Sequence, residues 1–266
     1  MCSDIECFGE KLFEYRTHRW MGSTAIITGA SSGIGEAIGE TLLKLKINVV
    51  GIGRNLAILK EIEKRHLLDS ALGKLFPFEC DLKNEKRLIE IFEYVNTNLG
   101  GVSVLVNAAG ILLPTTLIDG STEMWQEMME INVISLGICI NEAVKSMIKN
   151  NIDGCIININ CYCGHEVPNI PFPSYNFYSG TKFGVTALNE TVRRELKHLG
   201  LKIKTSMISP DVVNTELNHN LLDIADTKKL LTKGPTLNPE DVADACLFIL
   251  GAPPNVGIDD IKLRAI

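Results

Sequence analysis

The feature that most constrains this chain is a regular alternation of short β-like runs with helical patterns. The helical segments show apolar residues that return every three or four positions. This alternation is typical of a parallel sheet, because parallel neighbours need a long crossover connection, usually a helix. Right-handed crossovers predict a single doubly wound α/β domain with helices on both faces and a ligand crevice at the carboxyl ends of the strands. We expect about seven strands, at 24–28, 48–53, 74–80, 103–110, 155–160, 202–209 and near 261–264.

Two long helices stand out, one from about Trp125 to Val144 and one from about Val185 to Leu199. Both keep an apolar stripe, so we expect them to flank one face of the sheet. The domain should span 21–266, and residues 1–20 are expected to form a flexible N-terminal extension. In the alternative for this extension, Phe8, Leu12 and Tyr15 form one weak helical stripe.

The charge balance excludes some partners. A net charge of −6 and a pI near 5.5 lack the basic excess that nucleic-acid or anionic-membrane binding needs. The eight cysteines lie mostly in apolar stretches without a C-x-x-C pair, which indicates reduced core thiols and no metal site. No secretory signal or membrane span is expected, so the predicted compartment is the cytoplasm.

A glycine-rich turn follows the first predicted strand. In TGASSGIG (28–35), Gly29, Gly33 and Gly35 have the spacing G-x-x-x-G-x-G, and a helix begins within the motif. Such a turn lets backbone N–H groups approach a pyrophosphate at the positive end of a helix, which predicts a Rossmann-type dinucleotide site. Glu36 stands where a Walker loop needs lysine. In the alternative interpretation the glycines serve only as a packing turn.

The second predicted strand ends in Arg54 and Asn55, where an NAD-specific site would place an acid for the ribose hydroxyl. A guanidinium there can pair with a 2′-phosphate. The sequence therefore predicts NADP(H) in preference to NAD(H). The alternative is that Arg54 is a solvated cap of the next helix.

Tyr178 and Lys182 are four residues apart on a predicted helix that begins near Asn176, so both project from one face. Together with the other motifs this pair makes the chain resemble the short-chain dehydrogenase/reductase family, from about residue 20 to the end. Its finer features are similar to the insect farnesol dehydrogenase-like branch. The motifs that carry the resemblance are TGASSGIG (28–35), CDL (80–82), VNAAG (106–110), Asn132 of INV, ININCYCGH (157–165), YSGTK (178–182) and SPDVVNTE (209–216).

The resemblance implies hydride transfer between a nicotinamide and an alcohol or carbonyl, with Tyr178 as the acid/base. Lys182 would lower the pKa of the tyrosine, because an ammonium favours phenolate, and would also hold the nicotinamide ribose. Asn132 would anchor a proton-relay water. The alternative interpretation is that its amide is purely structural, at a helix kink or an interface. The implied cofactor residues are Gly29, Ser31, Ser32, Gly33, Ile34, Gly35, Arg54, Asn55, Asp81, Leu82, Asn107, Ala109, Gly110, Tyr178, Lys182, Pro210, Val213 and Thr215.

Three positions depart from the family pattern. Cys161 stands where the family has a catalytic serine, and a thiol is a weak hydrogen-bond donor to a substrate oxygen. Ala108 replaces an asparagine and Asp211 replaces a glycine. The second hypothesis is therefore an NADP-binding protein with little or no turnover. A third is that Cys161 and Cys163 form a redox-sensing or metal-binding C-x-C pair.

The segments 163–177 and after Thr215 are expected to enclose the substrate. Their apolar content, including Pro168, Ile170, Phe172 and Phe177, suits a terpenoid, a steroid or an aliphatic carbonyl or alcohol. His165 is interpreted as a hydrogen-bonding loop residue rather than a base. The two long helices resemble those that pair subunits in the family, which predicts a homodimer or homotetramer.

Overall fold

An interior strand of the sheet is β1 (Thr24–Thr28), whose residues are all buried. In the computed structural model, which describes residues 17–67, 72–168, 176–219 and 234–266, it belongs to a seven-stranded sheet of order β3-β2-β1-β4-β5-β6-β7. Every neighbouring pair is parallel. The strand order reverses between β1 and β4, so the crevice predicted for a doubly wound sheet opens at that point.

The predicted strands are confirmed with small differences at their ends. The fourth was predicted too long: it stops at Asn107 because residues 108–110 leave the sheet for a turn beside the crevice. The other strands are β2 (Asn48–Gly53), β3 (Leu75–Glu79), β4 (Val104–Asn107), β5 (Cys155–Ile159), β6 (Lys204–Pro210) and β7 (Asp260–Leu263).

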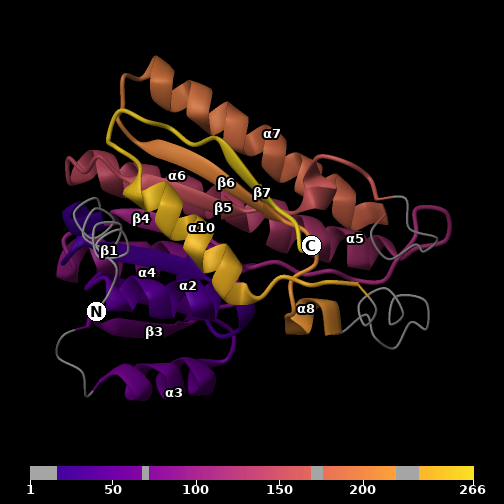
Figure 1. Ribbon diagram of the computed structural model, residues 1–266, viewed down its shortest axis with the longest axis horizontal. Helices are drawn as coiled ribbons and strands as arrows, with labels where there is room; N and C mark the ends of the chain where they lie inside the picture. The colour runs from indigo at the N-terminus through magenta and orange to yellow at the C-terminus, as the bar shows by residue number, and fades with distance from the viewer. Residues whose placement is uncertain (1–16, 68–71, 169–175, 220–233) are drawn as a thin grey trace.

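Helices cover both faces of the sheet, and each face has its own apolar core (Figure 1). One face carries α2 (Gly33–Lys44), α3 (Leu56–His66) and α10 (Pro239–Gly251). The other carries α4 (Glu85–Asn98), α6 (Ser135–Lys149) and α7 (Asn176–His198), so the two predicted long helices do share a face. Each fully buried leucine or isoleucine here contributes roughly 1.5–3 kcal/mol.

The first predicted long helix has a local irregularity. It is built from α5 (Thr122–Met129), a π-helical turn η2 (Glu130–Ile134) and α6. The helical stretch Thr122–Lys149 contains an 18-residue window with a mean hydropathy of 1.4, so by length and composition alone it could cross a membrane. Half of that apolar window is buried inside the molecule, where α6 packs into the core that it shares with α4 and α7.

The end of the expected N-terminal extension is packed against the domain. The short helix η1 (His18–Trp20) buries the Trp20 side chain, and the indole N–H donates to the carbonyl of Leu250 at 2.9 Å. Residues 17–20 therefore belong to the folded domain, which corrects the predicted boundary at residue 21. The rest of the extension, residues 1–16, lies outside the described residues.

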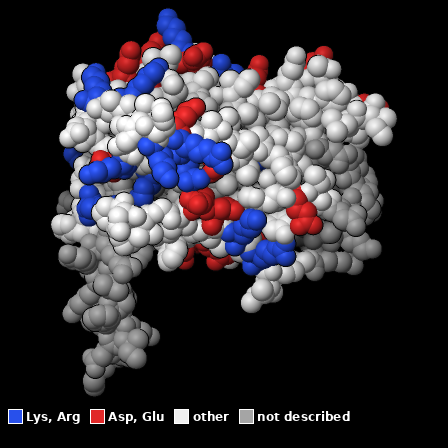
Figure 2. All heavy atoms as spheres, turned by 90° about the horizontal axis from the view of Figure 1, so that it is seen from above, with Lys and Arg blue, Asp and Glu red and all other residues white. Residues whose placement is uncertain are grey.

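Charged side chains of both signs are interspersed on the face shown in Figure 2. Ion pairs form on the surface of α7, where Glu190 accepts hydrogen bonds from Arg193 and Arg194. These exposed pairs contribute little to stability, typically about 0–1 kcal/mol.

Candidate active site

A pocket lies at the carboxyl ends of the strands, where the topology predicts it. It is bounded by the turn after β1, the segments that follow β4 and β5, the helix α7 and the segment after β6. Of the predicted cofactor residues, those that line it are Gly29, Ser31, Ser32, Gly33, Ile34, Gly35, Arg54, Asp81, Leu82, Ala109, Gly110, Tyr178, Lys182, Pro210, Val213 and Thr215.

The turn after β1 can be made only with glycines at two positions. Gly29 has a φ of +70°, and a Cβ there would lie 2.9 Å from the Cα of Ala109. A Cβ on Gly35 would lie 2.2 Å from the carbonyl oxygen of Gly29. Thr28 supports this approach, because its Oγ1 accepts a hydrogen bond from the Ala109 N–H at 3.2 Å. The backbone therefore forms a narrow cradle at the N-terminus of α2, which fits a pyrophosphate.

Two predicted cofactor residues do not line the pocket. Asn55 caps α3 instead, with its Oδ1 accepting from the Ile58 N–H at 3.2 Å. Asn107 is buried inside the sheet, and its Nδ2 donates to Asn158 Oδ1 at 2.9 Å. Asn158 in turn donates to Asn189 at 3.0 Å. In the structure one asparagine ends a helix and the other ties β4 to β5 and α7, and their contacts with a cofactor stay a prediction.

The adenosine end of the pocket is open to solvent. Arg54 follows β2 and is exposed on the pocket wall. Asp81 is also exposed, and its Oδ1 accepts from the Lys83 N–H at 3.0 Å, so this carboxylate shapes the turn after β3 as well as lining the pocket. Leu82 beside it is buried and supplies an apolar surface.

At the other end, Tyr178 and Lys182 lie one turn apart on α7 and are both nearly buried, 4% and 5% exposed. The Lys182 ammonium donates to the Ile159 carbonyl at 3.0 Å and lies 5.6 Å from the centre of the Tyr178 ring. Burial lowers the pKa of Lys182, while the nearby Cys161 and Cys163 act to raise it. The structure therefore confirms that the two side chains share one face and one pocket.

Asn132 lies in the π-helical turn and does not line the pocket. Its Oδ1 accepts from the Ile111 N–H at 2.8 Å, and its Nδ2 donates to the Ile111 carbonyl at 2.9 Å. The same Nδ2 lies 3.1 Å from Thr181 Oγ1 on α7. These contacts fix the segment after β4 against both long helices. The alternative in which Asn132 is a structural amide therefore explains its hydrogen bonds. The water-anchoring role stays a prediction.

Cys161 follows β5 and lines the pocket beside Tyr178 and Lys182. Cys163 follows two residues later, in the short helix η3 (Tyr162–Gly164), and lines the same pocket. The Cys163 hydrogen bond is the main cause that lowers the pKa of Cys161 to about 7, aided by the Lys182 charge and the Tyr178 hydroxyl and opposed by burial. The pKa of Cys163 is raised, because it donates to Cys161 and is buried.

The described residues show no group of three His, Cys, Asp or Glu side chains arranged to hold a metal ion. His165 makes the hydrogen bond expected of a loop residue: its Nε2 lies 2.9 Å from Ser209 Oγ and 3.3 Å from Asp260 Oδ2. Ser209 is fully buried and donates to Asp260 at 2.7 Å. This group fastens η3 to β6 and β7 and does not line the pocket.

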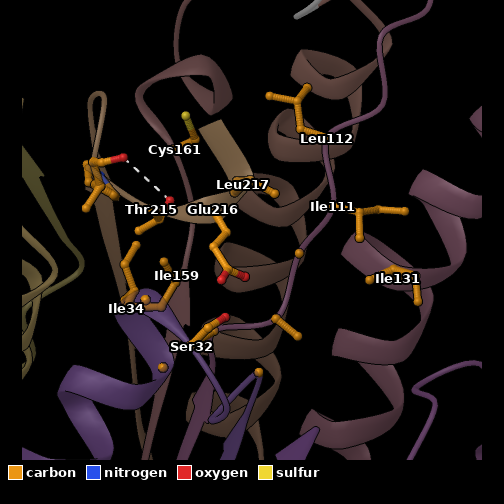
Figure 3. A pocket seen from close by; sticks show the side chains of 18 of the residues that line it. Ser32, Ile34, Ile111, Leu112, Ile131, Ile159, Cys161, Thr215, Glu216 and Leu217 are labelled. Atoms are coloured by element: carbon orange, nitrogen blue, oxygen red, sulfur yellow. Dashed lines mark hydrogen bonds between the residues drawn. The ribbon is translucent and has the colours of Figure 1, made fainter. Parts of the chain in front are cut away.

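The segment after Thr215, which was expected to enclose the substrate, lines the pocket. Glu216, in α8 (Glu216–His219), extends toward Ser32, and Leu217 follows it (Figure 3). Two other pocket residues, Ile111 and Leu112 in the segment after β4, were missed from the sequence. They directly follow the VNAAG motif, and that position was the available signal. Of the predicted substrate segments, Pro168 lines the pocket and Phe177 stacks on Trp125, whereas Ile170 and Phe172 lie outside the described residues.

The sheet is all-parallel, and the glycine cradle lies where the strand order reverses. Tyr178 and Lys182 line the same pocket. These features define a Rossmann-type protein built for a dinucleotide. The short chain dehydrogenase family model matches residues 23–225. The chain belongs to the short-chain dehydrogenase/reductase family, whose members are oxidoreductases that bind a nicotinamide cofactor.

Curated relatives and solved structures agree with this assignment. The chain is 41% identical to dehydrogenase/reductase SDR family member 11 of Bos taurus, over 92% of this chain and 97% of that protein. It is 38% identical to farnesol dehydrogenase of Aedes aegypti, over 93% and 98% of the two chains. A short-chain dehydrogenase/reductase structure from Mycobacterium marinum has a TM-score of 0.83 at 25% identity, covering 94% and 97%. Serine dehydrogenase in its closed form with NADP+ has a TM-score of 0.79 at 25% identity, covering 90% and 94%.

Proposed function

We propose that this protein is an NADP(H)-dependent oxidoreductase that interconverts an apolar alcohol and its carbonyl. The observation that carries the proposal is that Tyr178 and Lys182, buried one turn apart on α7, line the same pocket as the glycine cradle after β1. A single bound dinucleotide could therefore reach from the cradle to the proton-transfer pair.

The residues present fit the cofactor. Gly29 and Gly35 leave a cradle that a Cβ would fill, and the exposed Arg54 guanidinium offers a partner for a 2′-phosphate in place of the acid that NAD selectivity uses. When bound, the cofactor supplies or accepts the hydride at its nicotinamide. The NADP+ complex of the similar serine dehydrogenase adds support for the phosphorylated form.

In the proposed reaction Tyr178 donates a proton to the substrate oxygen during reduction and accepts it during oxidation. A free phenol titrates near 10, so it needs a cation close by to work near neutral pH. The Lys182 ammonium, 5.6 Å from the ring centre, provides that field. Its hydrogen bond to the Ile159 carbonyl holds it at this end of the pocket.

A second candidate function is NADP(H) binding with little turnover, and Cys161 is the observation that favours it. A thiol donates weakly, and the hydrogen bonds to this one favour its thiolate, which cannot donate at all. Loss of one donor to a developing oxyanion costs roughly 10²- to 10³-fold in rate.

The substrate is proposed to be apolar: a terpenoid, a steroid or an aliphatic compound. Ile111, Leu112 and Leu217 line the same pocket as Cys161 and give it apolar surface (Figure 3). The similarity to a farnesol dehydrogenase supports a terpenoid. We also propose that the protein works in the cytoplasm as a homodimer or homotetramer and does not bind nucleic acid.

The experiment that tests the proposal is NADPH oxidation by the purified protein against farnesal, a diketone and a ketosteroid, with NADPH affinity measured in parallel. Cys161→Ser is the matched variant. Turnover by the wild type supports the oxidoreductase. NADPH binding without turnover, together with activity gained by Cys161→Ser, would establish the binding protein instead.

A further inference from the structure

A cluster of three polar side chains lies next to the pocket, outside the groups that the proposed reaction uses. His165 follows η3, Ser209 lies near the end of β6, and Asp260 begins β7. His165 Nε2 lies 2.9 Å from Ser209 Oγ and 3.3 Å from Asp260 Oδ2, and the Ser209 hydroxyl donates to Asp260 Oδ1 at 2.7 Å. The cluster therefore joins three segments that are far apart in the sequence.

The hydrogen bonds define which group donates at each contact. A serine hydroxyl has one proton, and Ser209 uses it for Asp260, so the His165 ring donates from Nε2 to the serine oxygen. Burial lowers the pKa of His165, opposed by the Asp260 charge and aided by the Lys262 charge, which favours a neutral ring with its proton on Nε2. His165 is therefore a donor that ties η3 to the Ser209–Asp260 pair.

The same three residue types form the nucleophilic triad of many hydrolases, but the arrangement here is different. In such a triad the carboxylate and the hydroxyl contact opposite nitrogens of the ring. Asp260 and Ser209 both contact Nε2. Ser209 is also fully buried, so its oxygen is closed to a substrate. The cluster is therefore suited to holding segments together and not to nucleophilic attack.

Both ends of the cluster are close in sequence to residues that line the pocket. Cys163 lines it two residues before His165, and Pro210 lines it directly after Ser209. Cys163 also packs in one apolar cluster with Tyr178, the proposed proton donor. A shift of η3 relative to β6 would therefore change the shape of the pocket at Tyr178.

The short helix η3 is held from two sides. On the α7 side it cannot move closer, because a Cβ on Gly164 would already lie 2.7 Å from the Lys182 carbonyl oxygen. On the β6–β7 side it is held by the donor of His165 and by the exposed Arg264 guanidinium, which lies 4.1 Å from the centre of the Tyr162 ring. Loss of the His165 donor would therefore let η3 shift toward or away from the sheet.

We propose that His165 is a positioning residue for carbonyl reduction, which holds η3 in place beside Tyr178 through Ser209 and Asp260. The inference rests on the proposed function, because the position of η3 affects a rate only where a substrate oxygen must lie within reach of the Tyr178 hydroxyl. Rates depend steeply on such placement. A small displacement of η3 should therefore lower kcat far more than it weakens NADPH binding at the glycine cradle.

The test compares His165→Ala, His165→Gln and His66→Ala in the full-length protein. Glutamine keeps an N–H donor at the end of a side chain of similar reach. His66 is the matched control, since its side chain is 16% exposed, as that of His165 is, and its Nε2 lies 3.4 Å from Glu40 Oε1 outside the pocket. The measurements are kcat for the carbonyl that the wild type reduces fastest, the Kd of NADPH, the Tm, and hydrogen–deuterium exchange of residues 161–166.

We expect the kcat of His165→Ala to fall roughly tenfold, while the Kd of NADPH stays within about twofold. His165→Gln should recover kcat to within about threefold of the wild type, and His66→Ala should keep the wild-type kcat even where its Tm falls. Exchange in 161–166 should be faster in His165→Ala and unchanged in His66→Ala, because the N–H groups of Gly164 and of residue 165, bonded within η3, would open more often.

A wild-type kcat in His165→Ala would overturn the inference. So would an equal loss in His165→Gln, because the donor would then not be the cause. If His165→Ala does not fold, Ser209→Ala takes its place with the same outcomes, since it removes the acceptor of the same hydrogen bond. A wild type that reduces none of the carbonyls loses the proposed function. The exchange measurement then decides alone whether His165 holds η3, and unchanged exchange in His165→Ala contradicts it.

Discussion

The two ends of the pocket are held by different kinds of interaction. At the nucleotide end the backbone itself forms the site, and the close approach of Gly35 to the Gly29 carbonyl leaves no room for a side chain. At the reacting end the site consists of side chains from β5, α7 and η3, among them Cys161, Tyr178 and Lys182. A side chain can be exchanged without moving the backbone, so chemistry can change at the reacting end while the nucleotide end keeps the family pattern.

The largest effect should come from removing the proton-transfer group. Tyr178→Phe is expected to lower kcat/KM for carbonyl reduction by about 10²- to 10⁴-fold, because the proposed reaction then lacks its proton donor. NADPH affinity should change far less, since the backbone cradle is untouched. Steady-state NADPH oxidation and a fluorescence titration separate the two quantities; an equal loss in both would mean that Tyr178 acts mainly in holding the cofactor.

The next largest effect should arise at the nucleotide end. In Gly35→Ala the new Cβ would meet the Gly29 carbonyl oxygen at 2.2 Å, so the turn must open. Overpacking of this kind costs about 1–3 kcal/mol, which predicts up to roughly 100-fold weaker NADPH binding. Gly39→Ala, on the same helix with its nearest neighbour at 3.6 Å, should bind normally. Isothermal titration of both variants checks this, and equal affinities would refute the steric argument.

A smaller change with a distinct pH signature is expected for Cys161→Ser. The serine hydroxyl should raise the rate of carbonyl reduction by roughly 10- to 100-fold. Because the pKa of Cys161 is lowered to about 7, its donating thiol form is lost as the pH rises through that value, so the wild-type rate should fall there. The variant should lack this falling limb. A wild-type profile without an inflection near neutral pH would contradict the assignment.

The smallest effect should be on cofactor selectivity. Arg54→Ala removes the exposed guanidinium at the end of β2, which should weaken NADPH binding by about tenfold and leave NADH binding unchanged. Lys60→Ala removes an exposed charge from α3 outside the pocket and controls for net charge. Affinities measured for both cofactors decide this, and a parallel loss for NADH would show that Arg54 does not select the phosphate.

Local sequence patterns predicted most of the strands and helices, because the residues within each short segment are enough to indicate its type. The run TAIIT gave β1 with its bounds, since five apolar or β-branched residues suit a strand buried on both faces. The surroundings of the Asn107 side chain were not predicted: the strand continues through this residue, so its amide lies inside the sheet with Asn158, and the turn to the pocket starts one residue later. The capping of α3 by the Asn55 side chain was not predicted either.

The amino-acid sequence by itself determined the order of strands and helices, the glycine cradle, and the spacing that puts Tyr178 and Lys182 on one helix face. These depend on local backbone sterics and helical periodicity. Only the tertiary structure decided that Asn132 holds Ile111 and that the Trp20 indole donates to Leu250. Such contacts join elements that are brought together by packing of the whole sheet, and no local pattern specifies their distances or charges.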